Sequence, residues 1–467
     1  MIQAAPPDSA GAAPEYREGG AVTFPSERER VGGILLFHYS PRFLGYGSAA
    51  NLREHVDSFE RYSRFPVWAV NTATTLPPAL ARFDFAAIVF HHSLFGAKAG
   101  SAGPHSGTPY YLLDEGHLEL ASRSRAYKVA FFQDEFTYCQ ARFEFCRTLE
   151  IDCVYTCFEP SEHERVWGAY TDVPEVRSVL PGYVDERLVD AAGRFALPDR
   201  DRDIDIGYRG RPTPVLFDTT QEKSEIGRRF AELAGGSGLR LDIALGMEDR
   251  LYGDDWYRFL GRCKGALGVE SGVTVVDLDD RVRGDYERIF RAKGEVTLED
   301  LRRGALPEYE GQVIYRTIAP RHFEAAAFET CQVLFEGRYS GLIEPDVHYL
   351  ALKKDFSNFS EVVERFKDPA LRRRITARAK ADLIDSGAYG YDSFIAGFDR
   401  DLERAGLDLG VGPDLKRRVD RAVRRGRVAR AVRARGRRDT VYVRNRALGL
   451  LGRAIAPLRR RESSDQA

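Results

Sequence analysis

The chain has 467 residues, of which 43% are hydrophobic, 11% aromatic and 30% charged, with a formal net charge of −1. At roughly 150 residues per domain this length predicts two or three domains, and the composition excludes a disordered or collagen-like chain. No apolar run approaches the roughly 20 residues that a membrane-spanning helix needs. The first residues show no basic start followed by an apolar core, so we expect no signal peptide.

The near-zero net charge hides an uneven distribution. Between Asp414 and Arg461 there are 18 Arg and Lys residues against 3 Asp, whereas the rest of the chain has 51 basic and 67 acidic residues. A basic segment of this kind is attracted electrostatically to an anionic partner. We expect an anionic membrane surface. A solvated or self-docked tail and nucleic acid are the alternatives, the last disfavoured because the acidic body would repel a phosphate backbone.

Residues 1–30 are rich in Ala, Pro, Gly, Ser and Glu and are predicted to be a flexible leader. Residues 31–200 then alternate short apolar strands with helices such as Asn51–Tyr62 and Pro160–Tyr170. Continuous apolar runs are typical of strands buried on both faces of a parallel sheet, which predicts a doubly wound α/β domain. The expected strands are Gly33–His38, Pro66–Asn71, Ala86–Phe90, Lys128–Phe132, Ile151–Thr156 and Val176–Leu180.

A polar run, Pro198–Asp203, is predicted to link this domain to a second α/β domain over 201–390. The stretch 274–313 interrupts the second alternation and is predicted to be an insertion with one or two helices of its own. The expected strands are Asp205–Tyr208, Leu239–Leu245, Gly265–Val269, Gln332–Phe335 and Tyr349–Leu352, and the expected helices are Glu222–Leu233, Asp254–Cys263, Arg321–Glu329, Phe359–Phe366 and Asp368–Ile384.

A closing helix is expected over 391–406, and a basic amphipathic tail over 407–467. Arg-rich amphipathic helices are typical of segments that lie on a membrane surface. The apolar stripe of the tail consists of Leu415, Val419, Ala422 and Val423, and later of Leu448, Leu451, Ile455 and Leu458.

Six cysteines without a secretory signal indicate a reducing compartment and free thiols. Cys139, Cys146, Cys153 and Cys157 cluster along the chain, but their spacing matches none of the usual zinc patterns. We expect buried core cysteines, with a metal site as the minor alternative.

The most informative stretch runs from Tyr315 to Glu336 and is predicted to be a loop, a helix with Pro320 in its first turn, and a buried strand. Exposed backbone N–H groups at a helix start favour an anion such as a diphosphate. Arg321 and His322 add positive or donor character there, and Glu324, one turn further, could accept hydrogen bonds from a ribose diol. The alternative is a helix whose acidic first turn only complements the helix dipole.

This stretch resembles the C-terminal signature of nucleotide-sugar glycosyltransferases of the two-Rossmann (GT-B) type. It is most similar to family-4-like bacterial members, including the CgeB-like group, which Leu334–Glu344 and His348–Asn358 also fit. The resemblance covers about residues 205–400, whereas over 31–200 only the pattern of elements matches. It implies an α/β fold with two Rossmann-like domains facing a central cleft, the donor held mainly by the C-terminal domain and the acceptor mainly by the N-terminal one.

Within this resemblance, Glu324 matches the second Glu of the family's E-x7-E motif, which binds the donor ribose. Arg316 stands where the motif has its first Glu, and Glu270 is our hypothesis for the residue that takes that place. The family also places an Arg and a Lys on the donor diphosphate, and Arg211 and Lys223 are the candidates. Two cations would neutralise charge on the leaving nucleotide, the task of a metal in other transferases, so we expect no metal and no cofactor.

In the N-terminal domain, Gly45 and Gly47 follow the first strand and permit close backbone approach to a ligand; the resemblance suggests that this loop faces the cleft. His91, Asp134 and Glu135 follow buried strands at the same edge of the sheet. Asp134 or Glu135 could act as base for an acceptor hydroxyl, and His91 could polarise it. Each of these residue types is more often a capping or structural group.

The segment Asp277-Leu-Asp279-Asp280 contains a D-x-D sequence, which binds a divalent metal with the donor in single-Rossmann (GT-A) transferases. Carboxylates suit Mg²⁺ or Mn²⁺. The motif lies in the predicted insertion, however, and acidic triplets are common in turns. Metal-dependent donor binding is therefore the minor alternative.

These features predict a glycosyltransferase that moves a hexosyl or related group from a nucleotide-diphosphate donor to a hydroxyl of a glycan or glycolipid, in envelope polysaccharide or glycoconjugate synthesis. We expect it in the cytoplasm, peripheral to the inner membrane face through residues 407–467, with no nucleic-acid partner. Two alternatives remain: a nucleotide-sugar epimerase of the same fold, and a non-catalytic nucleotide-sugar-binding or scaffold protein that acts through its basic tail.

Overall fold

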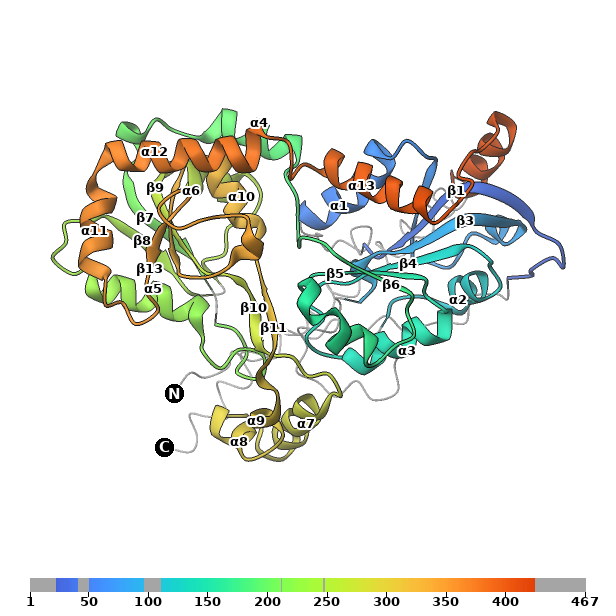
Figure 1. Cartoon of the computed structure of the whole chain (residues 1–467), viewed down its shortest axis with the longest axis horizontal. Coiled ribbons are helices and arrows are strands. Elements are labelled where there is room, and N and C mark those ends of the chain that lie inside the picture. The colour runs from blue at the N-terminus through green and yellow to red at the C-terminus, as the bar shows by residue number, and fades with distance from the viewer. Residues whose placement is uncertain (1–21, 41–49, 96–110, 211, 247, 425–467) are drawn as a thin grey trace, which may run out of the picture.

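The computed structural model describes residues 22–40, 50–95, 111–210, 212–246 and 248–424. The predicted site residues Gly45, Gly47 and Arg211 and the tail beyond residue 424 lie outside these ranges. The described helices and strands form two α/β units side by side, with a small third group of helices below them (Figure 1).

The first unit is built on six parallel strands in the order β2-β1-β3-β4-β5-β6. Side chains along β1 alternate between two cores: Ile34 and Leu36 face α1 and α13, and Leu35 and Phe37 face α2 and α3. Burial on both faces explains why these strands are continuous apolar runs. The strands are β1 (Glu29–His38), β2 (Val67–Asn71), β3 (Phe83–Phe90), β4 (Tyr127–Phe131), β5 (Cys153–Thr156) and β6 (Glu175–Ser178), and the helices are α1 (Ala50–Tyr62), α2 (Glu115–Ser122), α3 (Cys139–Leu149) and α13 (Tyr391–Arg404).

The second unit has five parallel strands in the order β13-β12-β9-β7-β8. Helices α5 and α11 cover one face, and α4, α6, α10 and α12 cover the other. Two parallel sheets, each covered on both faces, confirm the predicted α/β fold class with two Rossmann-like domains. The elements are α4 (Glu186–Phe195), β7 (Ile204–Arg209), α5 (Glu222–Leu233), β8 (Leu241–Ala244), α6 (Asp254–Arg262), β9 (Cys263–Gly268), α10 (Pro320–Ala327), β12 (Cys331–Phe335), β13 (Leu350–Leu352), α11 (Phe359–Lys367) and α12 (Pro369–Lys380).

The chain passes between the two domains at residues 184 and 390, and the two passages form a parallel β-bridge. The N–H of Val184 donates to Tyr389 O (2.8 Å), and the N–H of Tyr391 donates to Val184 O (3.1 Å). Helix α4, which precedes the predicted boundary at residue 200, therefore packs in the second domain, and α13 returns to cover the first sheet.

The predicted insertion contains three helices rather than one or two: α7 (Arg281–Lys293), α8 (Leu298–Arg302) and α9 (Leu306–Tyr309). They lie between two strands that the sequence pattern did not predict, β10 (Ser271–Val275) and β11 (Glu310–Thr317), which pair antiparallel. Val273 and Tyr315 of this pair belong to the hydrophobic core of the first domain. The β10–β11 pair therefore joins the two domains.

Residues 413–424 form a helix that packs on the first domain. Val419 and Val423, from the predicted apolar stripe, are buried in the core of that domain. Trp68 Nε1 donates to Asp420 Oδ1 at 2.8 Å. The first part of the predicted tail is thus docked on the chain's own body and presents no apolar stripe to a membrane.

All six cysteines are buried free thiols. Among the described residues, none of the helices has both the length and the apolar character to cross a bilayer.

Candidate active site

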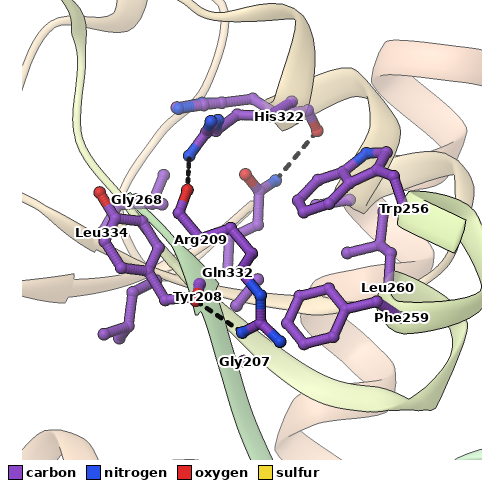
Figure 2. A pocket seen from close by; sticks show the side chains of 14 residues that line it. Gly207, Tyr208, Arg209, Trp256, Phe259, Leu260, Gly268, His322, Gln332 and Leu334 are labelled. Carbon is purple, nitrogen blue, oxygen red and sulfur yellow. Dashed lines mark hydrogen bonds between the residues drawn. The ribbon is translucent and has the colours of Figure 1, made fainter. Parts of the chain in front are cut away.

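A pocket lies at the carboxyl ends of β7 and β9, beside the N-terminal half of α10 (Figure 2). It holds about 390 Å³ of empty space, including the part open to solvent. Figure 2 shows Trp256 and Phe259 on one side and Gly268 and Leu334 on the other. Open parallel α/β sheets bind ligands at this edge, so the pocket is the candidate donor site.

The pocket depends on a glycine in its floor. A Cβ at Gly207 would overlap the Cys263 Sγ and the Phe259 ring, so a larger residue would push β7 away from α6. The close approach of strand and helix holds the two walls of the pocket together.

Positive charge gathers at the start of α10. Ala319, which precedes the helix, provides no side-chain cap, and the exposed Arg321 donates to Arg209 O at 3.2 Å. The Arg209 guanidinium lies 4.0 Å from the centre of the Phe259 ring and pairs with Asp242 at 2.8 Å. An uncapped helix start beside an exposed Arg can bind an anion.

Glu324 lies one turn into α10, and Trp256 Nε1 donates to its Oε2 at 2.8 Å. Burial raises the pKa of Glu324, whereas the Trp256 hydrogen bond and the charge of Arg321 oppose that rise. No other group in the described part of the chain donates to this carboxylate. Its second oxygen, Oε1, therefore accepts no hydrogen bond from the described residues.

His322 lines the pocket and is fully buried. Burial and the neighbouring Arg321 lower its pKa to about 3, so the imidazole is neutral. Within the described ranges neither ring nitrogen has a hydrogen-bond partner. Because buried polar atoms normally form hydrogen bonds, we expect a bound water or a ligand atom to hydrogen-bond to this ring.

Lys223 lies in the first turn of α5, and its carbonyl accepts a hydrogen bond from Tyr208 Oη at 2.7 Å. The adjacent Glu222 pairs with Arg316 (3.1 Å) and with Lys354 (2.9 Å). Arg316 is thus held in an ion-pair network beside Lys223. The network carries two guanidinium or ammonium groups for one carboxylate, which adds positive charge to this side of the domain.

Glu270 is 7% exposed, and its Oε1 accepts the backbone N–H groups of Arg338 (3.0 Å) and Tyr339 (2.8 Å). The loop that it anchors has three consecutive left-handed residues, Tyr339, Ser340 and Gly341, with φ of 48°, 57° and 72°. Backbone strain of this kind persists only where surrounding contacts enforce it. The structure therefore places Glu270 under a strained loop that follows β12, with one carboxylate oxygen committed to that loop.

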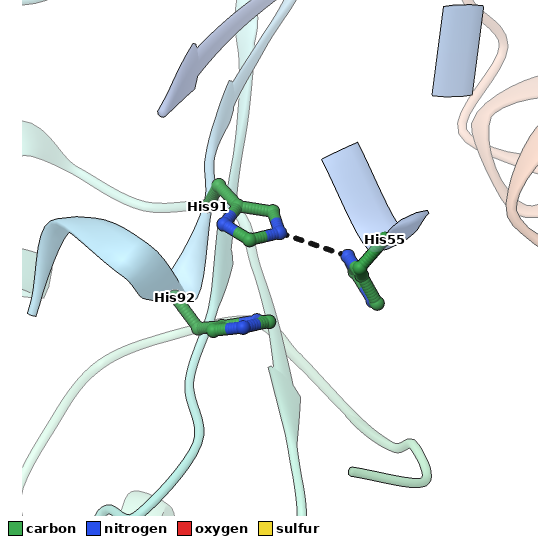
Figure 3. A group of neighbouring side chains, drawn as sticks. All are labelled: His55, His91 and His92. Atoms are coloured by element: carbon green, nitrogen blue, oxygen red, sulfur yellow. Dashed lines mark hydrogen bonds between the residues drawn. The ribbon is translucent and has the colours of Figure 1, made fainter. Parts of the chain in front are cut away.

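His91 follows β3 and is fully buried (Figure 3). Its Nδ1 accepts the backbone N–H of Ser93 at 3.1 Å, so its proton lies on Nε2, which donates to His55 Nδ1 at 2.9 Å. Burial lowers the pKa of His55 and of His91 well below the ordinary value, and that of the adjacent His92 to about 4. The three rings are neutral, and His91 has no exposed atom with which to reach an acceptor.

His55, His91 and His92 place potential metal-ligand atoms within 4.8 Å of one another. A histidine that binds a metal carries its proton on the other nitrogen and donates it to an outer partner. In His91 that other nitrogen accepts a backbone N–H instead. The hydrogen bonds of His55 and His91 therefore fix the tautomer of each ring, and they do not match the pattern expected of a metal centre.

Asp134 and Glu135 follow β4, where the first domain meets the β10–β11 pair. Asp134 is exposed, and its N–H donates to Tyr315 Oη at 3.1 Å. Glu135 is 2% exposed and accepts the N–H of Cys157 at 2.7 Å, and burial raises its pKa to about 7. Of these two candidate bases, only Asp134 lies where an acceptor can approach.

The carboxylates of the D-x-D sequence accept hydrogen bonds within the insertion and from the first domain. Asp277 accepts two backbone N–H groups at the start of α7 (3.1 and 2.7 Å), and Asp280 accepts the N–H of Cys139 (3.2 Å). Asp279 accepts from Tyr309 Oη at 2.6 Å. These contacts explain the triplet as helix capping and docking of the insertion onto the first domain.

No family model matches the chain, and no curated protein sequence resembles it significantly. Several solved structures are similar in overall shape. Anabaena Alr3699/HepE in complex with UDP and glucose has a TM-score of 0.44 at 10% identity over 80% of this chain and 100% of that one. Sucrose-phosphate synthase from Thermosynechococcus elongatus has a TM-score of 0.40 at 10% identity over 81% and 99%.

A third solved structure, TarM, has a TM-score of 0.38 at 11% identity over 68% of this chain, which spans only 54% of TarM. A glycosyltransferase from Rickettsia africae ESF-5 has a TM-score of 0.42 at 8% identity over 81% of this chain and 98% of that one. Because all four likenesses are of low identity, the fold assignment rests on the chain's own two parallel sheets.

Three residues of these sites were not predicted from the sequence: Arg209, Trp256 and His55. Arg209 lies in the strand end that drew attention to Arg211, and Trp256 is one of only three tryptophans in the chain. His55 is recognisable only once α1 is placed on the first sheet, because its partner is 36 residues away.

Proposed function

We propose that this protein is a glycosyltransferase that moves a sugar from a nucleotide-diphosphate donor to an acceptor hydroxyl. The observation that carries the proposal is that Arg321 and Glu324 both lie on the first turns of α10, a helix beside a pocket at the carboxyl edge of the second sheet. An anion-binding group and a hydroxyl-binding carboxylate at that spacing suit a diphosphate joined to a ribose.

In this proposal, Arg321 and the uncapped helix start hold the diphosphate and stabilise the charge that develops when it leaves. The Glu324 carboxylate accepts hydrogen bonds from the ribose. Asp134, exposed on the first domain, takes the proton from the acceptor hydroxyl as the glycosidic bond forms. His91 acts only through His55 and Ser93, since it is buried.

We also propose the finer assignment: hexosyl transfer to a glycan or glycolipid of the cell envelope, at the inner face of the cytoplasmic membrane. Residues 425–467 contain 13 Arg and 3 acidic residues, and the helix 413–424 fixes where this segment leaves the first domain. Juxtamembrane basic segments are attracted to anionic lipid by about 1 kcal/mol per basic residue near the surface.

A vesicle sedimentation assay tests the membrane assignment. The full chain is expected to bind phosphatidylglycerol vesicles at low salt, to release at high salt, and not to bind phosphatidylcholine. A chain lacking residues 425–467 is expected to lose this binding. Equal binding by that shortened chain, or binding that salt does not affect, contradicts the electrostatic assignment.

A thermal-shift screen against UDP, GDP, ADP, CMP and dTDP, with and without EDTA, tests the donor site. A ligand that binds only the native state raises the melting temperature, because at 100 times its Kd it adds about 2.7 kcal/mol to the unfolding free energy. We expect a shift with one diphosphate that EDTA does not change. A shift that EDTA abolishes favours the metal alternative, and no shift with any nucleotide contradicts the proposal.

Turnover of the matching nucleotide sugar separates the enzyme classes. Transfer needs an added acceptor, whereas an epimerase converts the nucleotide sugar without one. Glu324→Ala is expected to lower kcat/KM by about 100-fold or more, because the ribose loses a charged acceptor. Unchanged donor binding and turnover in this variant would contradict the site assignment.

A further inference from the structure

Asp134, the exposed carboxylate at the end of β4, has an uncommon backbone conformation. Its φ is 52°, in the left-handed region that residues other than glycine seldom adopt. Tyr138, at the other end of the same loop, has a φ of 53°. Strained residues of this kind persist where surrounding contacts enforce them, and they cluster at functional sites. The loop therefore depends on contacts that hold Asp134 in this conformation.

Two buried side chains hold the backbone of Asp134. Its N–H donates to Oη of Tyr315, on β11, at 3.1 Å. Its carbonyl accepts a hydrogen bond from Nη2 of Arg142, on α3, at 3.1 Å. Arg142 is 1% exposed and also donates to the carbonyl of Thr137 in the same loop. The peptide groups on both sides of the Asp134 Cα are thus fixed, while the residue itself is exposed.

Tyr315 is fixed in turn by the core of the first domain. It is 3% exposed, and its ring packs edge-on against Phe158 at 4.7 Å and Phe136 at 5.6 Å between ring centres. Burial raises the pKa of the Tyr315 hydroxyl well above its ordinary value, so the hydroxyl keeps its proton. Tyr315 is therefore a neutral hydrogen-bonding group in a fixed position, and it does not act as an acid or a base.

The strand that carries Tyr315 leads directly into the helix of the candidate donor site. Strand β11 ends at Thr317, and α10 begins at Pro320. The intervening turn is held as well, because Thr317 Oγ1 hydrogen-bonds with Ser340 Oγ at 2.9 Å. Figure 1 shows the β10–β11 pair between the two domains. One short, fixed segment thus connects Asp134 of the first domain to the start of α10 in the second.

We propose that Tyr315 is a positioning residue, which holds the Asp134 carboxylate at a fixed place relative to the start of α10. This inference rests on the proposed function, in which Asp134 takes the acceptor proton. As the acceptor oxygen bonds to the anomeric carbon and the bond from that carbon to the diphosphate breaks, the hydroxyl proton passes to Asp134. A catalytic group that is misplaced by about 1 Å can cost about 100-fold in rate. Donor binding does not depend on this group.

Kinetics of Tyr315→Phe on the full chain test the inference, because Phe keeps the packed ring and removes only the hydroxyl. The donors are UDP-glucose, GDP-mannose and ADP-glucose. The acceptor is p-nitrophenyl glucoside, and hydrolysis by water is the second readout. For the donor that the wild type turns over, the variant is expected to lower kcat by about 10-fold to 100-fold and to keep the donor Kd within about 2-fold.

A double variant separates positioning from a general loss of structure. Asp134→Asn is expected to lower kcat by about 100-fold or more and to remove the acid limb of the pH profile of kcat. Tyr315→Phe is expected to keep that limb with a lower plateau. In the Asp134→Asn background, Tyr315→Phe is expected to change kcat by less than about 2-fold, because the group that it positions is gone.

Tyr155 provides a matched control. It is 4% exposed, and its Oη donates to Asp401 Oδ2 at 2.8 Å in the core between the first sheet and α13. Tyr155→Phe also removes one buried tyrosine hydroxyl and is expected to leave kcat unchanged. Arg142→Lys removes the guanidinium contact with the Asp134 carbonyl and is expected to behave like Tyr315→Phe, so the test does not depend on one variant.

The levels of the proposal fail in different ways. A wild-type protein that neither binds nor turns over any of the three donors contradicts the proposed function. Unchanged kcat in Asp134→Asn contradicts the assignment of the base, and with it the role of Tyr315. If Asp134→Asn is impaired, a kcat of Tyr315→Phe within about 2-fold of the wild type, or an equal loss in both backgrounds, overturns only the positioning by Tyr315.

Discussion

Glu135 shows how burial sets the charge of one side chain. It is 2% exposed, and burial raises its pKa to about 7 in spite of the N–H that it accepts from Cys157. Because the folded-state pKa lies above the unfolded value, the protonated carboxyl stabilises the fold below about pH 4.5, and this contribution is lost as the pH rises through 7.

We therefore predict that Glu135→Gln removes a pH dependence. Relative to the variant, the wild type is expected to lose about 3 kcal/mol of unfolding free energy between pH 4.5 and pH 7.5, from a shift of about 2.5 pKa units. Urea denaturation at several pH values measures this difference. A constant difference across that range contradicts the assignment.

Arg202 is a buried side chain that carries a positive charge. It is 5% exposed, and its guanidinium donates to the carbonyls of Cys263 (2.7 Å) and Phe328 (2.7 Å) and to Thr330 Oγ1 (3.1 Å). These acceptors lie at the start of β9 and in the turn after α10, so one side chain holds two elements of the second domain together.

Arg202→Met is expected to lower the unfolding free energy by about 3 to 5 kcal/mol, because several buried carbonyls lose their donor. Chemical denaturation measures the loss. The exposed Arg200, on the same short segment, provides the control, and Arg200→Met is expected to change stability by less than about 0.5 kcal/mol.

At the scale of elements, the insertion is held by side-chain caps. Asp277 accepts the N–H groups of Val282 and Arg283 at the start of α7, although burial raises the pKa of its carboxyl to about 7. The loss of such a cap usually costs about 1 to 2 kcal/mol. The acidic triplet is therefore expected to matter for folding of the insertion and not for metal binding.

Asp277→Ala is predicted to expose the 274–313 segment to limited proteolysis, whereas Asp277→Asn, which keeps a side-chain acceptor, is expected to protect it. Adding EDTA or Mg²⁺ is expected to change neither digestion pattern. Metal-dependent protection in the wild type that Asp277→Ala abolishes would restore the metal interpretation.

At the scale of the whole molecule, side-chain contacts also join the domains, besides the chain crossings at residues 184 and 390. The Tyr315 ring of β11 packs edge-on against Phe158 and Phe136 of the first domain, at 4.7 and 5.6 Å between ring centres. Arg338 pairs with Glu159 across the domains at 2.8 Å. These contacts join the carboxyl edges of both sheets, where the candidate donor and acceptor groups lie.

The docked helix 413–424 divides the basic tail into two parts with different roles, and two truncations separate them. A chain ending at residue 424 is expected to keep the melting temperature of the full protein. A chain ending at residue 406 uncovers Trp68 and the core around Val31, and is expected to melt at least 5 °C lower. Equal melting temperatures would show that the helix does not stabilise the first domain.

The sequence by itself determined the strands of the two parallel sheets and the class of fold, because strands buried on both faces need continuous apolar runs whatever their neighbours are. It also identified Arg321, His322 and Glu324 as one group, since a single helix turn brings them together. Helix α5 has the predicted bounds, Glu222–Leu233, and helix α13 (Tyr391–Arg404) begins at the predicted residue and ends two residues before the predicted 406.

Only the tertiary structure determined which side chain each of these groups contacts. The Trp256–Glu324 bond spans 68 residues and the His55–His91 bond spans 36, and no local pattern records such pairs. The pairing of β10 with β11 and the docking of residues 413–424 likewise depend on surfaces that exist only after the first domain has folded. Local periodicity reflects burial along one element, whereas the site depends on contacts between elements.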